Sequence, residues 1–253
     1  MPDQDPYSAA DRTLFVLEAL ADHSRITDIV AASGLPKATV HRILQNLVRR
    51  GFARANERGE YVGGPRILSL SGRFLQRRDL AEQVHPVLRT LQQGTGWTAH
   101  LALLSGDEAV YVAKVEGAKP YHLASRVGMA LGLHCTSIGK AILATMPDAE
   151  VRALVRRTGL ASRTPNTLTD EQDLLRELSL VRRRGYALDH EENEAGVRAA
   201  GAAVFDHTGQ VIGGVSAAGL VHPGDEGGAD DERGELVVRA AEHISEELGA
   251  RQP

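Results

Sequence analysis

An unbroken order of helix, break, helix and hairpin in residues 26–63 constrains this chain more than any other feature. A short helix ends at the Gly34-Leu35-Pro36 break, and Val40, Ile43, Leu44 and Leu47 then follow at i, i+3, i+4 and i+7. That spacing gives a helix over residues 37–50 with one apolar stripe against a small core. Residues 52–54 and 60–62 flank a turn-forming tip at residues 56–59, which predicts a hairpin. The order as a whole predicts a winged helix-turn-helix.

The other side of helix 37–50 carries side chains that suit DNA. At about 100° per residue, its polar residues fall opposite the apolar stripe. An Arg fork pairs with guanine and a Gln amide with adenine, while Lys and Thr at a helix start suit phosphate oxygens. We therefore predict DNA contacts at Lys37, Thr39, His41, Arg42, Gln45 and Arg49, and at Arg58 on the hairpin tip. The alternatives are a solvated charged face and a winged helix that binds protein.

Helix-start signals lie upstream of this segment. Ser8 and Asp11 have the spacing of a capping box and are expected to open a first helix. Thr27 is expected to cap the second helix.

Charge is distributed unevenly along the chain. The whole chain has 29 Lys and Arg against 33 Asp and Glu, a formal net charge of −4. Residues 37–78 contain ten basic residues and only two acidic ones, whereas residues 79–253 contain 17 basic and 25 acidic residues. A basic module on an acidic body confines affinity for phosphate to one part of the protein.

Length and cysteine content limit the class of protein. With 253 residues and 42% hydrophobic content, the chain has room for a small DNA-binding domain and a larger domain with its own core. Cys135 is the sole cysteine, so an intramolecular disulfide is excluded. The polar N-terminus lacks the apolar run of a signal peptide, and no segment approaches about 18 uninterrupted apolar residues. We expect a soluble cytoplasmic protein that does not bind a membrane.

Residues 65–78 are predicted to form a helix with a broad apolar face made of Ile67, Leu68, Leu70, Phe74 and Leu75. A linker this apolar needs a partner surface. A second copy of the chain is the natural partner, because helix-turn-helix proteins usually present two recognition helices to a pseudopalindrome. The alternative is that this helix packs on its own domain.

The remaining sequence alternates between helix and strand patterns. Helices are expected over residues 80–93, 138–145, 148–157, 170–184 and 232–248, with Thr169 capping the fourth of these. Strands are expected over residues 98–104, 109–115, 121–125, 186–188, 199–205 and 210–217. Strands joined by short turns, with helices grouped around them, predict an antiparallel sheet of the α+β class.

Several segments resemble the IclR family of bacterial transcriptional regulators, in order and at the family's spacing. They are LPKATVHRILQNLVRRGF (residues 35–52), GPRIL (64–68), ASRVG (124–128), LHCTSIGKAILA (133–144), TPNTLTD (164–170) and RGYALDHEENEAGVR (184–198). The resemblance implies an N-terminal winged helix-turn-helix in residues 1–63, a dimerising linker helix in 64–79, and a GAF-like effector-binding and oligomerisation domain in 80–253. It also implies homodimers, which in this family commonly pair into tetramers. We expect no cofactor.

The resemblance places the effector pocket on segments with suitable chemistry. Around Ser137, hydroxyl and backbone N–H groups lie at a helix start, where they suit a carboxylate or another oxyanion. Asp189 at a strand end suits an effector hydroxyl, and Ser216 matches a family position that contacts small organic acids. The expected pocket residues are Cys135, Thr136, Ser137, Ile138, Asp189, Ala199, Ser216 and Ala218. A capped helix with no ligand is the alternative.

Three departures from the family pattern bear on the effector. Ala199 stands where many members have Cys, Ala218 where a second hydroxyl often occurs, and Gly132 where Pro is common. Small residues in a pocket wall leave volume and remove polar anchors. They predict an effector bulkier or more apolar than a two- or three-carbon keto acid, although close packing of strand and helix also selects small residues.

Other function classes receive less support from the sequence. There is no Gly-x-Ser-x-Gly elbow and no phosphate-binding glycine loop, and adjacent residues on an extended segment point apart, so His134 and Cys135 do not make a catalytic pair. We expect no enzyme activity. The alternative to an organic effector is a metal- or redox-responsive regulator using Cys135 and His134. The sequence as a whole predicts a regulator, most simply a repressor of an adjacent catabolic operon, controlled by an organic or aromatic acid or a related metabolite.

Overall fold

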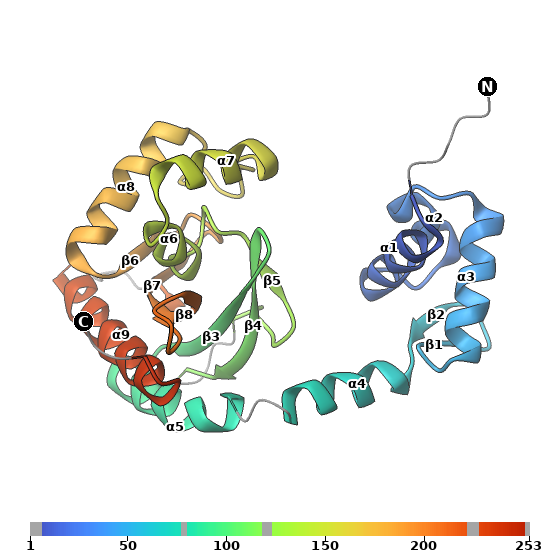
Figure 1. The fold of residues 1–253 in the computed structure, drawn as a ribbon, viewed down its shortest axis with the longest axis horizontal. Helices are drawn as coiled ribbons and strands as arrows, with labels where there is room; N and C mark the ends of the chain where they lie inside the picture. Colours follow the sequence, from blue (N-terminus) through green and yellow to red (C-terminus); the bar gives the residue numbers. More distant parts are fainter. Residues whose placement is uncertain (1–6, 77–79, 118–122, 222–227, 251–253) are drawn as a thin grey trace. The chain divides into compact units, whose positions relative to one another are not determined.

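The computed structural model describes residues 7–76, 80–117, 123–221 and 228–250 (Figure 1). The chain divides into two compact units, Met1–Asp79 and Leu80–Pro253. Within the described residues, no helix is both long and apolar enough to cross a membrane.

Three helices form the body of the first unit. They are α1 (Ala9–Asp22), α2 (Ile26–Ser33) and α3 (Lys37–Arg49). The reciprocal capping box of Ser8 and Asp11 is present as predicted. The expected cap at Thr27 is wrong: Arg25 is the N-cap residue and makes no side-chain cap, while the Thr27 hydroxyl donates to Asp28. Gly34 ends α2 with a φ of 65°, a left-handed conformation that glycine adopts without strain.

The predicted hairpin consists of β1 (Ala53–Ala55) and β2 (Tyr61–Gly63), which pair antiparallel. Val40, Ile43, Leu44 and Leu47 of α3 are buried against α1, α2 and Ala53, so the predicted stripe forms the centre of this core. The winged helix-turn-helix predicted from the sequence is confirmed. Helix α4 (Pro65–Gln76) follows the hairpin, and the Leu68 side chain on it is 76% exposed.

The second unit is built on a six-stranded antiparallel sheet in the order β5-β4-β3-β8-β7-β6. The strands are β3 (Thr98–Ser105), β4 (Glu108–Val115), β5 (Ala130–Leu131), β6 (Ala187–His190), β7 (Val197–Phe205) and β8 (Val211–Leu220). The helices are α5 (Leu80–Thr95), α6 (Ser137–Ala144), α7 (Asp148–Thr158), α8 (Glu171–Arg184) and α9 (Gly228–Glu247). The predicted α+β class with an antiparallel sheet is confirmed.

Helices cover both faces of the sheet (Figure 1). Helices α5 and α9 pack on one face, where Leu88, Val237 and Ile244 are fully buried. Helices α6, α7 and α8 cover the other face through a second core that includes Ile138, Ile142 and Leu178. Since side chains alternate along a strand, the longer strands β3, β4, β7 and β8 contribute to both cores.

Two local predictions in this unit differ from the structure. The strand predicted over residues 121–125 is absent at residues 123–125, while residues 121 and 122 lie outside the described residues. Asp170, not Thr169, caps α8, because its carboxylate accepts hydrogen bonds from the backbone N–H groups of Gln172 and Asp173. A carboxylate is favoured at this position because it also interacts with the positive end of the helix dipole.

Close packing of α6 on the sheet accounts for part of the small-residue run in β7. A methyl group added at Gly201 would lie 2.9 Å from the backbone nitrogen of Ile138. At Gly214 in β8, it would lie 3.1 Å from the Ile138 side chain. Glycine at these positions therefore reflects the short distance between helix and sheet, and it leaves little free volume for a ligand.

Candidate functional site

The exposed side of α3 presents the polar side chains that the sequence singled out. Lys37, His41, Arg42, Gln45 and Arg49 are exposed, and Thr39 is half-buried. The buried stripe of the same helix anchors them to the core of the first unit. The Arg49 guanidinium donates to the side-chain oxygen of Asn46 on the same helix face. This face offers the hydrogen-bond donors and acceptors that base edges and phosphates require.

The tip of the β1–β2 hairpin is organised by Asn56. Its side-chain oxygen accepts hydrogen bonds from the backbone N–H groups of Arg58 at 3.0 Å and of Glu60 at 2.9 Å. Its amide nitrogen donates to the Glu60 carboxylate at 2.9 Å. Arg58 is exposed at this tip. The tip is thus a structured turn that holds a basic side chain in solvent.

In the second unit, the candidate site is a cavity of about 40 Å³ between the sheet and the start of α6. Its lining includes all the predicted pocket residues except Cys135: Thr136, Ser137, Ile138, Asp189, Ala199, Ser216 and Ala218. These residues come from α6, β6, β7 and β8, which are far apart in the sequence. The fold therefore brings the predicted residues together, but around a space that holds no more than a few water molecules.

The pairing of the strands sets out the floor of this cavity. Asp189 on β6 is opposite Ala199 on β7, which is opposite Ala218 on β8. Two residues along β8, Ser216 is opposite His100 on β3. Residues two apart on a strand share a face, so these side chains all point towards α6. The floor thus has Asp189 at one end and His100 at the other, with the small side chains of Ala199, Ala218 and Ser216 between them.

The start of α6 closes the cavity from the other side. The Thr136 hydroxyl caps the helix by accepting from the backbone N–H of Gly139 at 3.1 Å, and it donates to the carbonyl of Gly132 at 2.7 Å. Ser137 and Ile138 follow in the first turn, where backbone N–H groups have no partner within the helix. This arrangement suits an acceptor atom on a ligand, as the sequence predicted.

Asp189 is the most perturbed carboxyl group of the site. It is 4% exposed, and its Oδ1 accepts from the backbone N–H of Glu192 at 2.7 Å. Burial raises its pKa to about 7, against the lowering effect of that hydrogen bond. Near neutral pH, the carboxyl group is therefore poised either to donate or to accept a hydrogen bond. Buried titratable groups of this kind are concentrated at functional sites.

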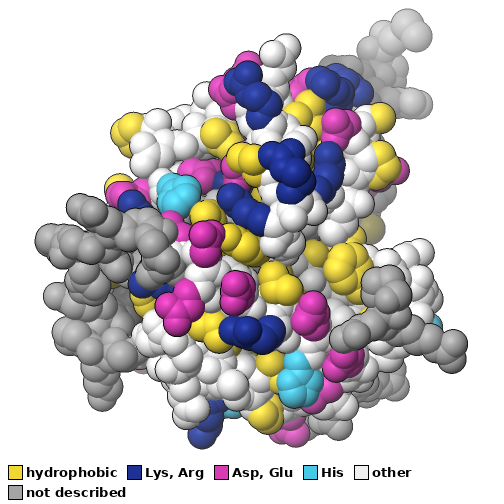
Figure 2. Space-filling model, turned by 90° about the vertical axis from the view of Figure 1, so that its left-hand side faces the viewer, with side chains coloured by type: hydrophobic (Ala, Val, Ile, Leu, Met, Phe, Trp, Pro, Cys, Tyr) yellow, Lys and Arg dark blue, Asp and Glu magenta, His cyan; other side chains and the backbone are white. Residues whose placement is uncertain are grey.

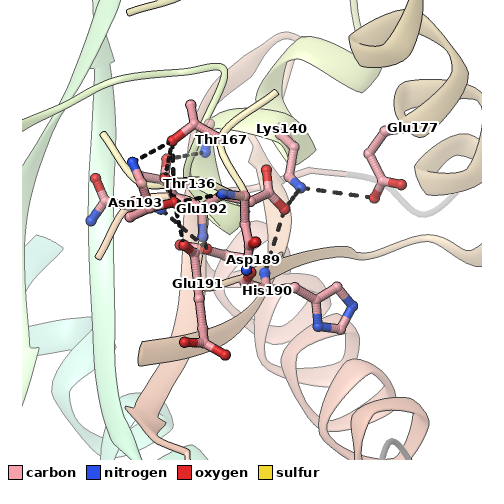
Figure 3. Close-up of polar contacts among 12 residues, drawn as sticks. Thr136, Lys140, Thr167, Glu177, Asp189, His190, Glu191, Glu192 and Asn193 are labelled. Carbon is pink, nitrogen blue, oxygen red and sulfur yellow. Dashed lines mark hydrogen bonds and ion pairs between the residues drawn. The ribbon is translucent and has the colours of Figure 1, made fainter. Parts of the chain in front are cut away.

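A polar network fixes the loop that follows Asp189 (Figure 3). The Lys140 side chain, 1% exposed on α6, is hydrogen-bonded to the Glu192 carboxylate and lies 4.0 Å from that of Glu177 on α8. From the opposite side, the Thr167 hydroxyl donates to the Glu192 carbonyl at 2.6 Å. The Thr164 hydroxyl donates to the Glu191 carbonyl at the same distance.

Two of the sequence motifs supply the side chains of this network. Lys140 belongs to the segment 133–144, and Thr164 and Thr167 belong to the segment 164–170. All three side chains form hydrogen bonds with the loop after β6. They thereby hold Asp189 and Asn193 at the cavity. Glu191 in this loop has a φ of 61°, a strained conformation for a residue other than glycine, which such a network can maintain.

Seven further residues line the cavity and were not predicted from the sequence: His100, Tyr111, Leu123, Ser125, Asn193, Glu194 and Val197. The His100 and Tyr111 rings lie 4.8 Å apart between centroids. The alternation of side chains along residues 98–104 places His100 on the other face of the strand from Ala99 and Leu101, which pack on the α5 side of the sheet. However, only the pairing of β3 with β8 brings it beside Ser216, and that pairing has no local sequence signal.

Cys135 and His134 do not form a site together. Cys135 is fully buried, and burial raises the pKa of its thiol to about 11, so the reactive thiolate is disfavoured at neutral pH. His134 Nε2 lies 3.1 Å from the carbonyl oxygen of Ala161. Among the described residues, no three His, Cys, Asp or Glu side chains are grouped so that they could hold a metal ion. The geometry gives no support to the alternative of a metal or redox sensor.

A second hollow of about 750 Å³ lies between α6, α8, α9 and β7. Ala141, Ala144, Val181, Ala202 and Phe205 are among the residues that line it. In Figure 2, exposed hydrophobic side chains are scattered among charged ones on the face of the molecule that is turned to the viewer. None of the predicted site residues borders this hollow. Ser245, a buried polar residue in its lining, is already hydrogen-bonded to Ala241 and Phe205. The smaller cavity brings together several buried polar side chains and therefore remains the candidate site.

Comparisons with known proteins cover both units. Residues 9–57 match the IclR helix-turn-helix domain, and residues 72–246 match the bacterial transcriptional regulator IclR C-terminal domain. The HTH-type transcriptional regulator XynR of Escherichia coli (strain K12) is 34% identical over 95% of this chain and 97% of its own length. The transcriptional repressor IclR of the same strain is 31% identical over 92% of this chain and 87% of its own.

Solved structures show the same likeness. An IclR homolog from Microbacterium hydrocarbonoxydans, crystallised in complex with 4-hydroxybenzoate, has 27% sequence identity and a TM-score of 0.77. The similarity covers 95% of this chain and 99% of that one. The relatives named here are regulators of transcription, not enzymes.

Proposed function

Because this chain belongs to the IclR family of bacterial transcriptional regulators, we propose that a small organic effector bound in the second unit controls its binding to an operator. It is a DNA-binding regulator of transcription, and the proposal concerns how it is controlled. The observation that carries the proposal is the cavity beneath α6, where four separate elements contribute the predicted polar and small residues. We further propose that the protein represses an adjacent catabolic operon. One relative is named a transcriptional repressor, which supports the direction of control.

The proposed DNA contacts are Lys37, Thr39, His41, Arg42, Gln45, Arg49 and Arg58. Apart from the half-buried Thr39, their side chains are exposed on α3 and on the hairpin tip, and the buried stripe orients the helix. In this proposal α3 enters the major groove and the wing contacts the flanking backbone. The protein then acts in the cytoplasm, associated with the nucleoid when it holds operator DNA.

The proposed assembly is a homodimer on a pseudopalindromic operator, with dimers pairing into tetramers. Leu68 supports the dimer, since a leucine that is 76% exposed on a helix with an apolar face invites a partner. In functional terms, the proposal divides the chain into a DNA-binding domain (1–63), a dimerising linker (64–79) and an effector-binding and oligomerisation domain (80–253).

The proposed effector is an organic or aromatic acid or a related metabolite. The start of α6 suits an acceptor atom, and Asp189 suits a hydroxyl group. The complex of one homolog with 4-hydroxybenzoate supports this class, because that compound carries both kinds of group. The proposed contacts are Thr136, Ser137, Ile138, Asp189, Ala199, Ser216 and Ala218. Cys135 borders them in sequence without lining the cavity.

Control by an effector requires a difference in affinity. The effector acts only if it binds the DNA-competent and DNA-incompetent arrangements of the protein with different affinities, and its effect on operator binding is then reciprocal. Cavity residues on α6 and on the loop after β6 are tied together by Lys140 and Glu192, so a ligand that moves one segment moves the other.

A two-step experiment tests the proposal with the full chain. The operator is first selected from random duplex DNA, and a thermal-shift screen of aromatic acids, keto acids and lactones then identifies compounds that raise the melting temperature. A compound that stabilises the protein and also releases it from the operator supports the proposal. Stabilising compounds that leave operator affinity unchanged would show that the cavity does not control DNA binding.

A further inference from the structure

His100 has a buried nitrogen with no partner. The side chain is 1% exposed, and its Nε2 lies 2.8 Å from the Ser125 hydroxyl. Its Nδ1 is buried, and no hydrogen-bond partner for it lies in the described part of the chain. Buried polar atoms in native proteins almost always have a partner, so an orphan atom beside a cavity points to a missing ligand group.

The charge state of the ring limits what that group can be. Burial, and after it the Lys114 ammonium, lowers the pKa of His100 to about 3, so the imidazole is neutral at physiological pH. A neutral imidazole has one nitrogen that donates and one that accepts, and either tautomer is compatible with the contact to Ser125. A carboxylate only accepts and an ammonium group only donates, whereas a hydroxyl group serves both tautomers.

His100 and Asp189 stand at opposite ends of the cavity floor. Strands β7 and β8 separate β6 from β3, and with the usual spacing of adjacent strands this puts the two outer strands about 14 Å apart. Between them, the floor consists of Ala199, Ala218 and Ser216. Both polar side chains reach inwards over this strip. Two polar side chains at the ends of a strip of small residues favour a flat ligand that carries one polar group at each end.

We propose that His100 is a specificity-determining residue, whose Nδ1 hydrogen-bonds a hydroxyl group of a flat effector while Asp189 holds a polar group at its other end. This inference rests on the proposed function, because it assigns a ligand class to the same cavity. A ring needs more room than about 40 Å³. Binding therefore includes an outward movement of the lining segments at Leu123 and Ser125 or at Asn193 and Glu194.

Two substitutions at His100 separate the two ring nitrogens. Asn places its amide near the position of Nδ1, whereas Gln reaches the position of Nε2 and the Ser125 hydroxyl. His100→Asn is therefore the matched control for His100→Gln. Both variants keep a polar side chain of similar size, and near-equal melting temperatures show that each is folded.

Paired probes isolate the hydroxyl group. The pairs are 4-hydroxybenzyl alcohol with 4-methylbenzyl alcohol, and 4-hydroxyphenylacetate with 4-methylphenylacetate, each titrated calorimetrically into the full-length protein. Within a pair only a hydroxyl is exchanged for a methyl group. We expect the wild-type protein and His100→Asn to prefer the hydroxyl compound at least about tenfold in one pair or both, and His100→Gln to lose that preference. In the wild-type protein, the ¹⁵N resonance of Nδ1 should shift on binding.

The outcomes distinguish this inference from the function on which it rests. An equal hydroxyl preference in wild type and His100→Gln, or an unshifted Nδ1 resonance, overturns the role of His100. Operator release by the same probes would then leave the proposed function standing. If neither pair binds the wild-type protein, the ligand class is wrong. The proposed function would still be judged by the wider screen and its effect on operator binding.

Discussion

At the scale of single residues, the raised pKa of the buried Asp189 carboxyl group makes the stability of the folded protein depend on pH. Its pKa of about 7 in the folded protein exceeds the usual value of an unfolded Asp, about 3.9. The folded state therefore binds the proton more tightly, so stability is lost as the pH rises from about 4 to 7. We expect Asp189→Asn to flatten this pH dependence, since its side-chain oxygen still accepts from the backbone N–H groups of Glu192 and Asn193.

Urea unfolding of both proteins between pH 4 and pH 8 measures the effect. The variant should be the more stable protein at pH 8, with a difference of about 1.4 kcal/mol for each unit by which the two pKa values of Asp189 differ. Parallel curves for wild type and Asp189→Asn across this range would contradict a raised pKa.

Two arginines of the first unit are predicted to act differently on DNA. In the proposed DNA complex, Arg42→Ala removes a bidentate base contact, so it should weaken operator binding by about 1 to 3 kcal/mol and relax the preference at one base pair in each half-site. Arg58→Ala removes a proposed phosphate contact. It should weaken binding to all DNA sequences similarly, and it should reduce the slope of log affinity against log salt concentration by about one unit. Titrations of operator and scrambled duplexes at several salt concentrations check both, and unchanged affinity in Arg42→Ala would remove that residue from the reading face.

At the scale of elements, the contact between α6 and β7 depends on glycine. A methyl group at Gly201 would lie 2.9 Å from the Ile138 nitrogen, closer than packed atoms allow. Gly201→Ala should therefore destabilise the protein by about 1 to 3 kcal/mol. Gly94→Ala in α5 is the control, because its added methyl group would lie 3.6 Å from the Leu236 side chain, an ordinary contact. Chemical denaturation compares them, and equal stabilities would show that α6 has room to move.

Helix α4 carries the prediction about assembly. Leu68→Glu combined with Leu70→Glu should dissociate the proposed dimer, because charges buried at a helical interface cost several kcal/mol. Ser69→Glu adds the same charge at an exposed position of the same helix and should leave the dimer intact. Sedimentation at micromolar concentration decides the matter. A double variant that stays dimeric would place the interface elsewhere.

Helices and turns that follow local sequence rules were predictable from the sequence, whereas features that depend on distant strand pairing were not. Helix α3 and the hairpin follow local rules of periodicity and turn formation, so their positions were predictable to within a residue or two. The cap of α8 was misplaced by one residue, because Thr169 and Asp170 are both good caps and only the geometry selects one. His100 was missed because its role depends on the non-local pairing of β3 with β8.

At the scale of the whole molecule, binding to DNA and binding of the effector are assigned to different units. The first unit holds the exposed basic face of α3, and the second holds the cavity beneath α6. We propose that occupation of the cavity changes the affinity of the protein for the operator. A change confined to the cavity should then abolish the response while leaving the DNA-binding face unaffected.

The most direct test measures operator affinity with and without an effector identified by the thermal-shift screen, in wild type, Asp189→Ala and Ala199→Leu. We predict that each variant binds the operator as wild type does when no effector is present. We also predict that the effector response of Asp189→Ala is weakened at least about tenfold, or roughly 1.4 kcal/mol, and that Ala199→Leu excludes bulky effectors. If both variants fold, bind the operator and respond to the effector with unchanged affinity, the signal enters the protein elsewhere.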